Sequence, residues 1–208
     1  MWLSFYNPKG VGDVLMLVAG DLPRERTAAE TQANITRIYD NQTNDTVGYN
    51  VDHISDYFTI HDEGHVVLSD EQLEQLNQRL YEFGFDPIEI DRTPRLVAAH
   101  VLSVTPHPDS DHLSITQTEV GLEEPLQIVC GAANVHEDMT SIAALSDAVM
   151  PNGQIIRPGE LRGVESFGML CSAYELGLDP EHQLKGILDL DEAYAPGTPL
   201  EDIIDQIK

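Results

Sequence analysis

The chain has 208 residues, with 36 acidic and 11 basic side chains and a formal net charge of −25. Such a charge repels nucleic acid and anionic membranes unless the few cations gather on one face. A hydrophobic content of 41% excludes wholesale disorder, and no apolar run reaches the length of a membrane span. Two cysteines are too few for a disulfide scaffold, so we expect a cytoplasmic protein with reduced thiols.

The first part of the chain contains short β-like runs separated by turn residues and followed by one helix. The predicted strands are Met1–Tyr6, Asp13–Ala19, Ile35–Tyr39, Thr46–Val51 and Tyr57–Ile60. Ser69 and Gln72 have the spacing of a capping box, which begins a helix that Gly84 ends. One stripe of this helix is apolar: Leu73, Leu76, Leu80 and Phe83. The pattern predicts a small α+β domain over residues 1–91, with the helix packed on a sheet.

A turn-rich segment leads into a second series of short strands. They are predicted at Leu96–Val104, His112–Val120, Leu126–Val129, Thr140–Ala144 and Gly186–Leu190. Five strands indicate a small closed barrel, because a sandwich would need about seven. The run Thr198-Pro199-Leu200-Glu201 has the pattern of a capping box with proline at the first helical position. We therefore predict an all-β barrel with short helices over residues 92–208.

The usual signatures of catalysis and of bound cofactors are missing from the sequence. Gly10 and Gly12 lack the further residues of a phosphate-binding loop, and a tight hairpin explains them better. No G-x-S-x-G motif occurs, and Cys130 and Cys171 have the contexts of small core residues. The histidines have no spacing that fixes a set of metal ligands. We expect no enzyme activity, no cofactor and no metal.

Three sequence blocks in the second domain carry a resemblance to a known family. They are H-P-D-S-D-H-L (107–113), I-V-C-G-A-A-N-V (128–135) and L-R-G-V-E-S-F-G-M-L-C-S (161–172). Their order and spacing resemble the tRNA-binding domain of the EMAP-like group, which also occurs in some methionyl-tRNA synthetases and in the bacterial phenylalanyl-tRNA synthetase β-subunit. With its additional N-terminal domain, the chain resembles the YtpR-like family of free-standing bacterial tRNA-binding proteins. The resemblance implies an OB fold, in agreement with the five-strand pattern.

The resemblance also implies weak, non-catalytic binding of tRNA that depends on RNA shape more than on sequence. In the S-x-G-M segment, Ser166 is expected to contact a phosphate or ribose, and Met169 either packs against a base or fills the core. Arg157 and Arg162 are candidates for phosphate contacts. The alternative for both arginines is a solvated surface on which they pair with Glu160 or Glu165. Three further candidates are Asn134, His107 and His112, of which Asn134 could equally be a turn former.

The histidines add a pH dependence to this expectation. His107, His112 and His136 would gain charge below about pH 6.5, which predicts stronger RNA binding on acidification. Two departures from the family pattern act in the opposite direction. His112 and Glu160 stand where relatives commonly carry lysine, which removes positive charge from the presumed RNA surface.

These departures leave a second reading of the barrel open. In that reading it is an acidic protein-interaction module that kept the OB fold, lost its RNA affinity and docks on a basic partner. The expected partners are therefore tRNA and, as further alternatives, an aminoacyl-tRNA synthetase, another basic protein or a second copy of the chain. No membrane contact is expected. The role of the N-terminal domain is left open.

Overall fold

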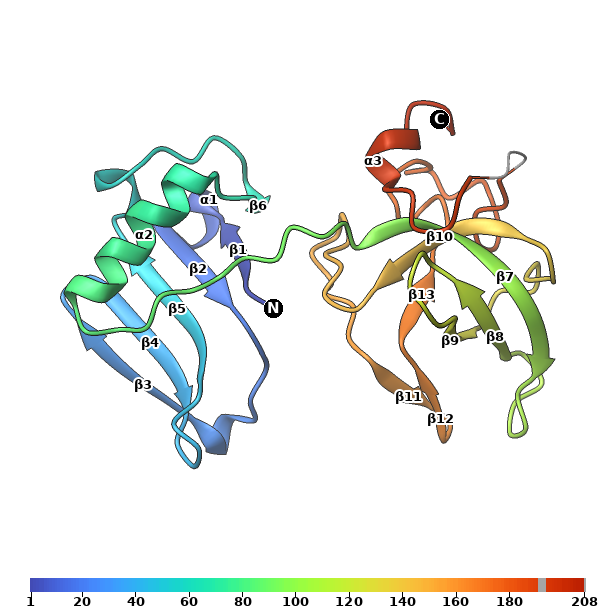
Figure 1. The fold of residues 1–208 in the computed structure, drawn as a ribbon, viewed down its shortest axis with the longest axis horizontal. Helices are drawn as coiled ribbons and strands as arrows, with labels where there is room; N and C mark the ends of the chain where they lie inside the picture. Colours follow the sequence, from blue (N-terminus) through green and yellow to red (C-terminus); the bar gives the residue numbers. More distant parts are fainter. Residues whose placement is uncertain (191–193, 208) are drawn as a thin grey trace. The chain divides into compact units, whose positions relative to one another are not determined.

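A computed structural model describes residues 1–190 and 194–207 of the chain. It divides into two compact units, Met1–Arg92 and Thr93–Lys208, which are described separately below (Figure 1). Among the described residues, no helix is long and apolar enough to cross a membrane.

The first unit is built on a six-stranded antiparallel sheet with the order β3-β4-β5-β2-β1-β6. Its strands are β1 (Leu3–Tyr6), β2 (Val14–Val18), β3 (Thr27–Gln32), β4 (Ile35–Asp40), β5 (Thr46–Asp52) and β6 (Gly64–His65). Strand β3 was not predicted, because its sequence, Thr-Ala-Ala-Glu-Thr-Gln, contains few of the residues that favour strands. The strand predicted at Tyr57–Ile60 is wrong. A short 3-10 turn, η2 (Ile54–Asp56), precedes these residues, and residues 57–60 themselves form a turn and irregular backbone.

Helix α2 (Asp70–Glu82) covers one face of this sheet (Figure 1). The predicted capping box is confirmed: the Gln72 amide donates to the Ser69 hydroxyl at 3.2 Å, and the Ser69 amide donates to the Gln72 side chain at 2.8 Å. Leu76 and Leu80 are buried against Leu15 and other core residues of the sheet. Two shorter helical turns, α1 (Pro8–Val11) and η1 (Arg24–Arg26), lie in the connections of the sheet.

The second unit is a nearly closed five-stranded barrel with the strand order β13-β10-β7-β8-β9. Its strands are β7 (Leu96–Pro106), β8 (Ser114–Glu119), β9 (Leu126–Cys130), β10 (Thr140–Leu145) and β13 (Gly168–Leu170). Strand β7 has an irregularity between Val101 and Ser103, where a long strand bends to serve both halves of a barrel. The OB-type architecture expected from the sequence is confirmed.

Two details of the barrel differ from the prediction. The fifth strand is β13, whereas residues 186–190 form a strap, in which the Leu188 amide donates to the Cys171 carbonyl and the Leu190 amide to the Thr140 carbonyl. The C-terminal helix α3 (Leu200–Ile203) begins at Pro199 without a capping box. The Thr198 hydroxyl that should cap it donates to the Ala195 carbonyl at 2.7 Å instead.

The barrel interior is apolar and contains Cys130, whereas Cys171 lies in a second apolar cluster that includes Leu200 and Ile203 of α3. Val101, Ile128 and Ala143 are among the fully buried residues of the interior. Cys130 and Cys171 are buried and free, as predicted from their sequence contexts. Burial raises the pKa of Cys171 to about 12, so this thiol stays protonated at neutral pH.

Candidate nucleic-acid interface

A two-stranded hairpin projects from the barrel and carries the L-R-G-V-E-S block of the sequence. It consists of β11 (Gly159–Leu161) and β12 (Val164–Ser166), which pair antiparallel with Leu161 opposite Val164. Figure 1 shows it at the end of the barrel away from α3. The two turn residues have positive φ, 49° at Arg162 and 84° at Gly163, as a type I′ turn requires.

Arg162 occupies the turn position that asparagine, aspartate or glycine normally fills. For an arginine, the left-handed conformation costs roughly 1–2 kcal/mol, because its Cβ approaches the neighbouring carbonyl oxygen. Strained residues of this kind concentrate at functional sites. The conformation places a guanidinium at the exposed tip of the hairpin.

Two hydrogen bonds join the hairpin to the loop between β7 and β8, residues 107–113. The ring of His107, which is only 3% exposed, donates from Nε2 to the Leu161 carbonyl at 3.0 Å. Its Nδ1 accepts from the Asp109 amide at 3.1 Å, so these two partners fit the neutral ring. Arg162 Nη1 donates to the Asp109 carbonyl at 3.0 Å. Two sequence blocks separated by about fifty residues therefore form one surface.

The outer face of strands β8 and β9 continues this surface. Gln117 and Gln127 are opposite each other, with 3.4 Å between the Gln117 Nε2 and the Gln127 Oε1. Gln127 Nε2 also donates to the Glu165 carbonyl at 2.8 Å. Beside them, the Phe167 amide donates to the Gln127 carbonyl at 3.0 Å, and the Phe167 side chain is 38% exposed. An exposed aromatic ring thus lies next to a pair of amide side chains.

Sequence reasoning did not find Phe167, Gln117 or Gln127. Phe167 is the variable position of the S-x-G-M segment. Its exposure depends on how β12 packs beside β9. The two glutamines interrupt otherwise apolar or threonine-rich strands, which is the signal that could have marked an outward face. Their pairing depends on a strand register that the sequence does not specify.

Ser166 and Met169 both lie where the barrel closes. Ser166 is 5% exposed, and its hydroxyl accepts from the Val129 amide at 3.0 Å and donates to the Gly168 carbonyl at 3.1 Å. The hydroxyl therefore joins β12 to β9. Met169 is half-buried on β13 and packs against an apolar cluster that includes Ile142.

The remaining predicted residues have different surroundings. Arg157 forms an ion pair with Asp147, and its side chain is 29% exposed. Asn134 holds the 186–190 strap, because its amide donates to the Ile187 carbonyl at 2.9 Å and its carbonyl accepts from the Ile187 amide at 3.0 Å. His112 is exposed in the 107–113 loop, with its Nδ1 2.9 Å from a carboxylate oxygen of Asp111.

Charge on the hairpin is mixed. Glu160 and Glu165 are directly opposite each other on β11 and β12, and both are exposed. Two negative charges within three residues of Arg162 reduce the positive potential at the tip. Within the described part of the chain, no three His, Cys, Asp or Glu side chains are grouped so as to hold a metal ion.

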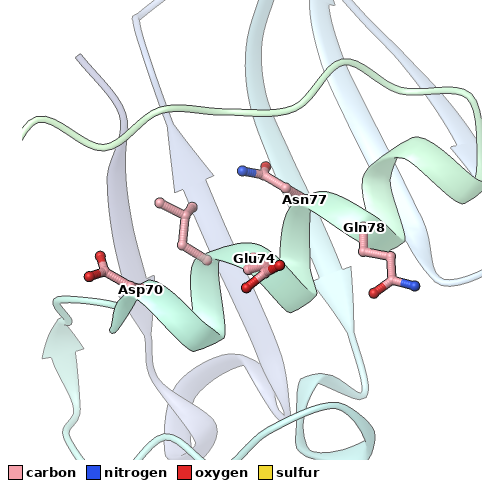
Figure 2. A pocket seen from close by; sticks show the side chains of 5 residues that line it. Asp70, Glu74, Asn77 and Gln78 are labelled. Carbon is pink, nitrogen blue, oxygen red and sulfur yellow. The ribbon is translucent and has the colours of Figure 1, made fainter.

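A separate groove in the first unit has a composition unsuited to RNA. It is open to solvent, runs beside α2 and is lined by Asp70, Leu73, Glu74, Asn77 and Gln78 (Figure 2). Its charged side chains are two carboxylates, which repel phosphate. The groove is therefore not a candidate for RNA binding.

The barrel, its projecting hairpin and the joined loop define an OB-type domain of the nucleic-acid-binding class. Residues 96–199 match the family described as "Putative tRNA binding domain", and residues 23–91 match a domain of unknown function, DUF4479. The chain is 41% identical over 195 residues to the "Putative tRNA-binding protein YtpR" of Bacillus subtilis, covering 93% of this chain and 96% of that protein. The chain belongs to this YtpR family.

Other relatives match a shorter part of the chain. The phenylalanine–tRNA ligase beta subunit of Chlorobium luteolum is 43% identical over 138 residues, which cover 62% of this chain but 17% of that subunit. The corresponding subunit of Methylococcus capsulatus is 45% identical over 121 residues, or 58% of this chain and 15% of the subunit. Among solved structures, the C-terminal domain of Plasmodium vivax p43 has 21% identity and a TM-score of 0.37, with 52% of this chain and 61% of that chain covered.

Proposed function

We propose that the chain binds tRNA, without catalysing a reaction on it, through one surface of the barrel. This surface, called the hairpin surface below, consists of the β11–β12 hairpin, the 107–113 loop and the outer face of β8 and β9. The observation that carries the proposal is that Arg162 and Phe167, an exposed cation and an exposed aromatic ring, lie at the two ends of β12.

Each part of the hairpin surface suits a different part of an RNA. The guanidinium of Arg162 provides charge-assisted hydrogen bonds to a phosphate. The ring of Phe167 provides a platform on which an unpaired base stacks, and the amides of Gln117 and Gln127 match base edges and ribose hydroxyls. Membership of the YtpR family, with its tRNA-binding domain, identifies tRNA as the RNA.

The proposed binding is weak and depends on salt. The second unit has 19 acidic and 5 basic residues, a net charge of −14, so its long-range field repels RNA. Attraction is therefore confined to short-range contacts on the hairpin surface. Such contacts recognise the shape and the unpaired bases of a folded RNA, and no array of base-specific contacts is needed.

In our proposal Ser166 and His107 hold this surface in place through their hydrogen bonds, and Met169 packs in the apolar cluster that includes residues of α3. Arg157, Asn134 and His112 stay predicted RNA contacts. We place the function in the cytoplasm, where tRNA is used, and an aminoacyl-tRNA synthetase as a partner stays a prediction. No observation on the barrel favours the alternative of an acidic protein-interaction module.

The test is a titration of labelled tRNA, followed by fluorescence anisotropy, with three variants of the full chain. Phe167→Ala should weaken binding by roughly 5- to 150-fold, which corresponds to about 1–3 kcal/mol per stacked base. Arg162→Asn removes the cation but retains a residue that tolerates the turn, and it should also weaken binding. Arg24→Asn, at an exposed arginine of the first unit, is the matched control and should bind as the wild type does. Equal affinity in all four proteins would refute the proposed surface.

A further inference from the structure

The sheet of the first unit has a second face that α2 does not cover. Residues Leu15, Leu17, Tyr49 and Val51 point to the helix and belong to the core. Because side chains alternate along a strand, the neighbours of these residues point to the opposite side. Figure 1 shows α2 and the segment that follows it on the same side of the sheet.

This opposite side, called the open face below, is apolar at its centre. Its half-buried apolar members are Phe5, Val14, Met16, Val18 and Ile38, and Leu3 beside them is only 4% exposed. None of them belongs to a core cluster of the unit. At Gly48 the face is flattened, because the missing side chain leaves room that Ile38 covers, with its Cβ 3.7 Å from where a Gly48 Cβ would be. The centre of the open face therefore forms a flat apolar surface.

The open face is also nearly free of charge, in a unit with 17 acidic and 6 basic residues. Its polar members between the strand ends include Thr31, Thr36 and Asn50. His65 lies against the Phe5 ring, with 5.5 Å between ring centroids, and burial lowers its pKa, so it is neutral at pH 7. Charges occur only at the strand ends among the described residues of this face, at Asp52 and in the ion pair of Arg26 with Asp40.

We propose that the open face is a dimerisation surface, and that its partner is the same face of a second copy of the chain. A charged partner would have to bury its charge against uncharged groups, whereas a second copy presents an uncharged apolar sheet. Two such sheets pack face to face at about 10 Å with nearly aligned strands, as in a β-sandwich. The contact is self-complementary, as a two-fold axis requires.

The size of the open face fits such a contact. Six strands at about 4.8 Å spacing and about 17 Å of strand length give a projected area of about 500 Å² per chain. Two such faces would bury about 1,000 Å² in total, which is the lower limit for a specific protein–protein interface. Apolar patches of a few hundred Å² on soluble chains commonly mark interaction sites.

Charge outside the open face makes the proposed dimerisation depend on salt. Two chains of −25 repel each other, and added salt screens this repulsion while it leaves the apolar contact intact. Dimerisation should therefore strengthen as salt rises. Binding of tRNA should weaken with salt, so the two properties are separable in one protein.

The experiment is sedimentation equilibrium of the full chain at about 50 and 500 mM salt. Thr36→Glu places a carboxylate on the open face, and Gln78→Glu adds the same charge on the exposed side of α2. We expect a monomer–dimer equilibrium that tightens with salt, is weakened about 100-fold or more by Thr36→Glu, and is unchanged by Gln78→Glu. Affinity for tRNA should be the same in the wild type and in both variants.

Two results would overturn the proposal: a monomer at every concentration and salt, or a dimer that Thr36→Glu leaves intact. Fluorescence of Trp2, which stacks on Tyr49 at 5.5 Å in the core of the first unit, reports whether each variant is folded. If Thr36→Glu does not fold, Met16→Ser replaces it, because this change removes an apolar contact of the open face without adding charge. Loss of tRNA binding alone would leave the dimer proposal standing.

Discussion

Replacing Ser166 by alanine separates a structural role of this residue from a direct contact with RNA. Its hydroxyl joins β9 to β12 through the Val129 amide at 3.0 Å, and both residues are buried. In Ser166→Ala the Val129 amide loses its hydrogen-bond acceptor. Because the site is buried, water does not take the place of the lost hydroxyl. A buried donor left unpaired lowers stability by about 1–3 kcal/mol. The contact between β9 and β12, called the seam below, should therefore open roughly 5- to 150-fold more often.

Native-state hydrogen exchange of the full chain measures this opening. The reporter is the Phe167 amide, which donates across the same seam to the Gln127 carbonyl at 3.0 Å. It should exchange faster in Ser166→Ala, whereas Ser103→Ala, at a half-buried serine of β7, should leave it unchanged. Affinity for tRNA should fall while its dependence on salt stays the same. Unchanged exchange together with a shallower salt dependence would refute the structural role and place the hydroxyl on a phosphate.

Three other predictions concern single groups. Asn134→Ala should destabilise the barrel by about 1–3 kcal/mol, because it removes both hydrogen bonds to Ile187, and it should leave the salt dependence of tRNA binding unchanged. Chemical denaturation followed by circular dichroism measures the stability, and an unchanged stability of the second unit would contradict this prediction. Cys171, with a pKa of about 12, should resist thiol reagents at pH 8 until the chain is unfolded, and rapid labelling of the native protein would show that the site is open. Hydrogen bonds, above all from the Ser55 side chain, lower the pKa of Asp13, so its stabilising effect is present above about pH 3.9 and is lost as pH falls through the lowered pKa. The difference in urea midpoint between the wild type and Ser55→Ala should therefore shrink from pH 7 to pH 3, and a constant difference would argue against this origin.

Local signals in the sequence predicted most of the fold. The capping box at Ser69 formed because the residues of a cap are adjacent in sequence and depend little on the rest of the chain. The similar pattern at Thr198 failed because a competing acceptor, the Ala195 carbonyl, lies closer in the folded chain. Residues 186–190 have a strand-like sequence but bond to two different strands as a strap, and only the tertiary fold decides this.

The sequence gives the residue types of the candidate site but does not specify their geometry. The L-R-G block directed attention to Arg162, but its left-handed backbone and its bond to Asp109 depend on the hairpin and loop meeting. Phe167 was missed because exposure of an aromatic ring is a property of the closed barrel. The serine of the same block was expected at the surface, yet its small hydroxyl bridges two strands inside the seam.

The salt dependence of tRNA affinity, measured for the wild type and for Arg162→Asn, tests the central claim most directly. If the tip of the hairpin contacts a phosphate, the slope of log K against log salt should become shallower by about 0.7–0.9 in Arg162→Asn. The stability of the barrel should stay the same or rise by about 1 kcal/mol, because asparagine suits the left-handed turn. Saturable binding with this change in slope is the result that we predict. Identical slopes for the two proteins, or no binding of tRNA by the wild type at low salt, would contradict the account.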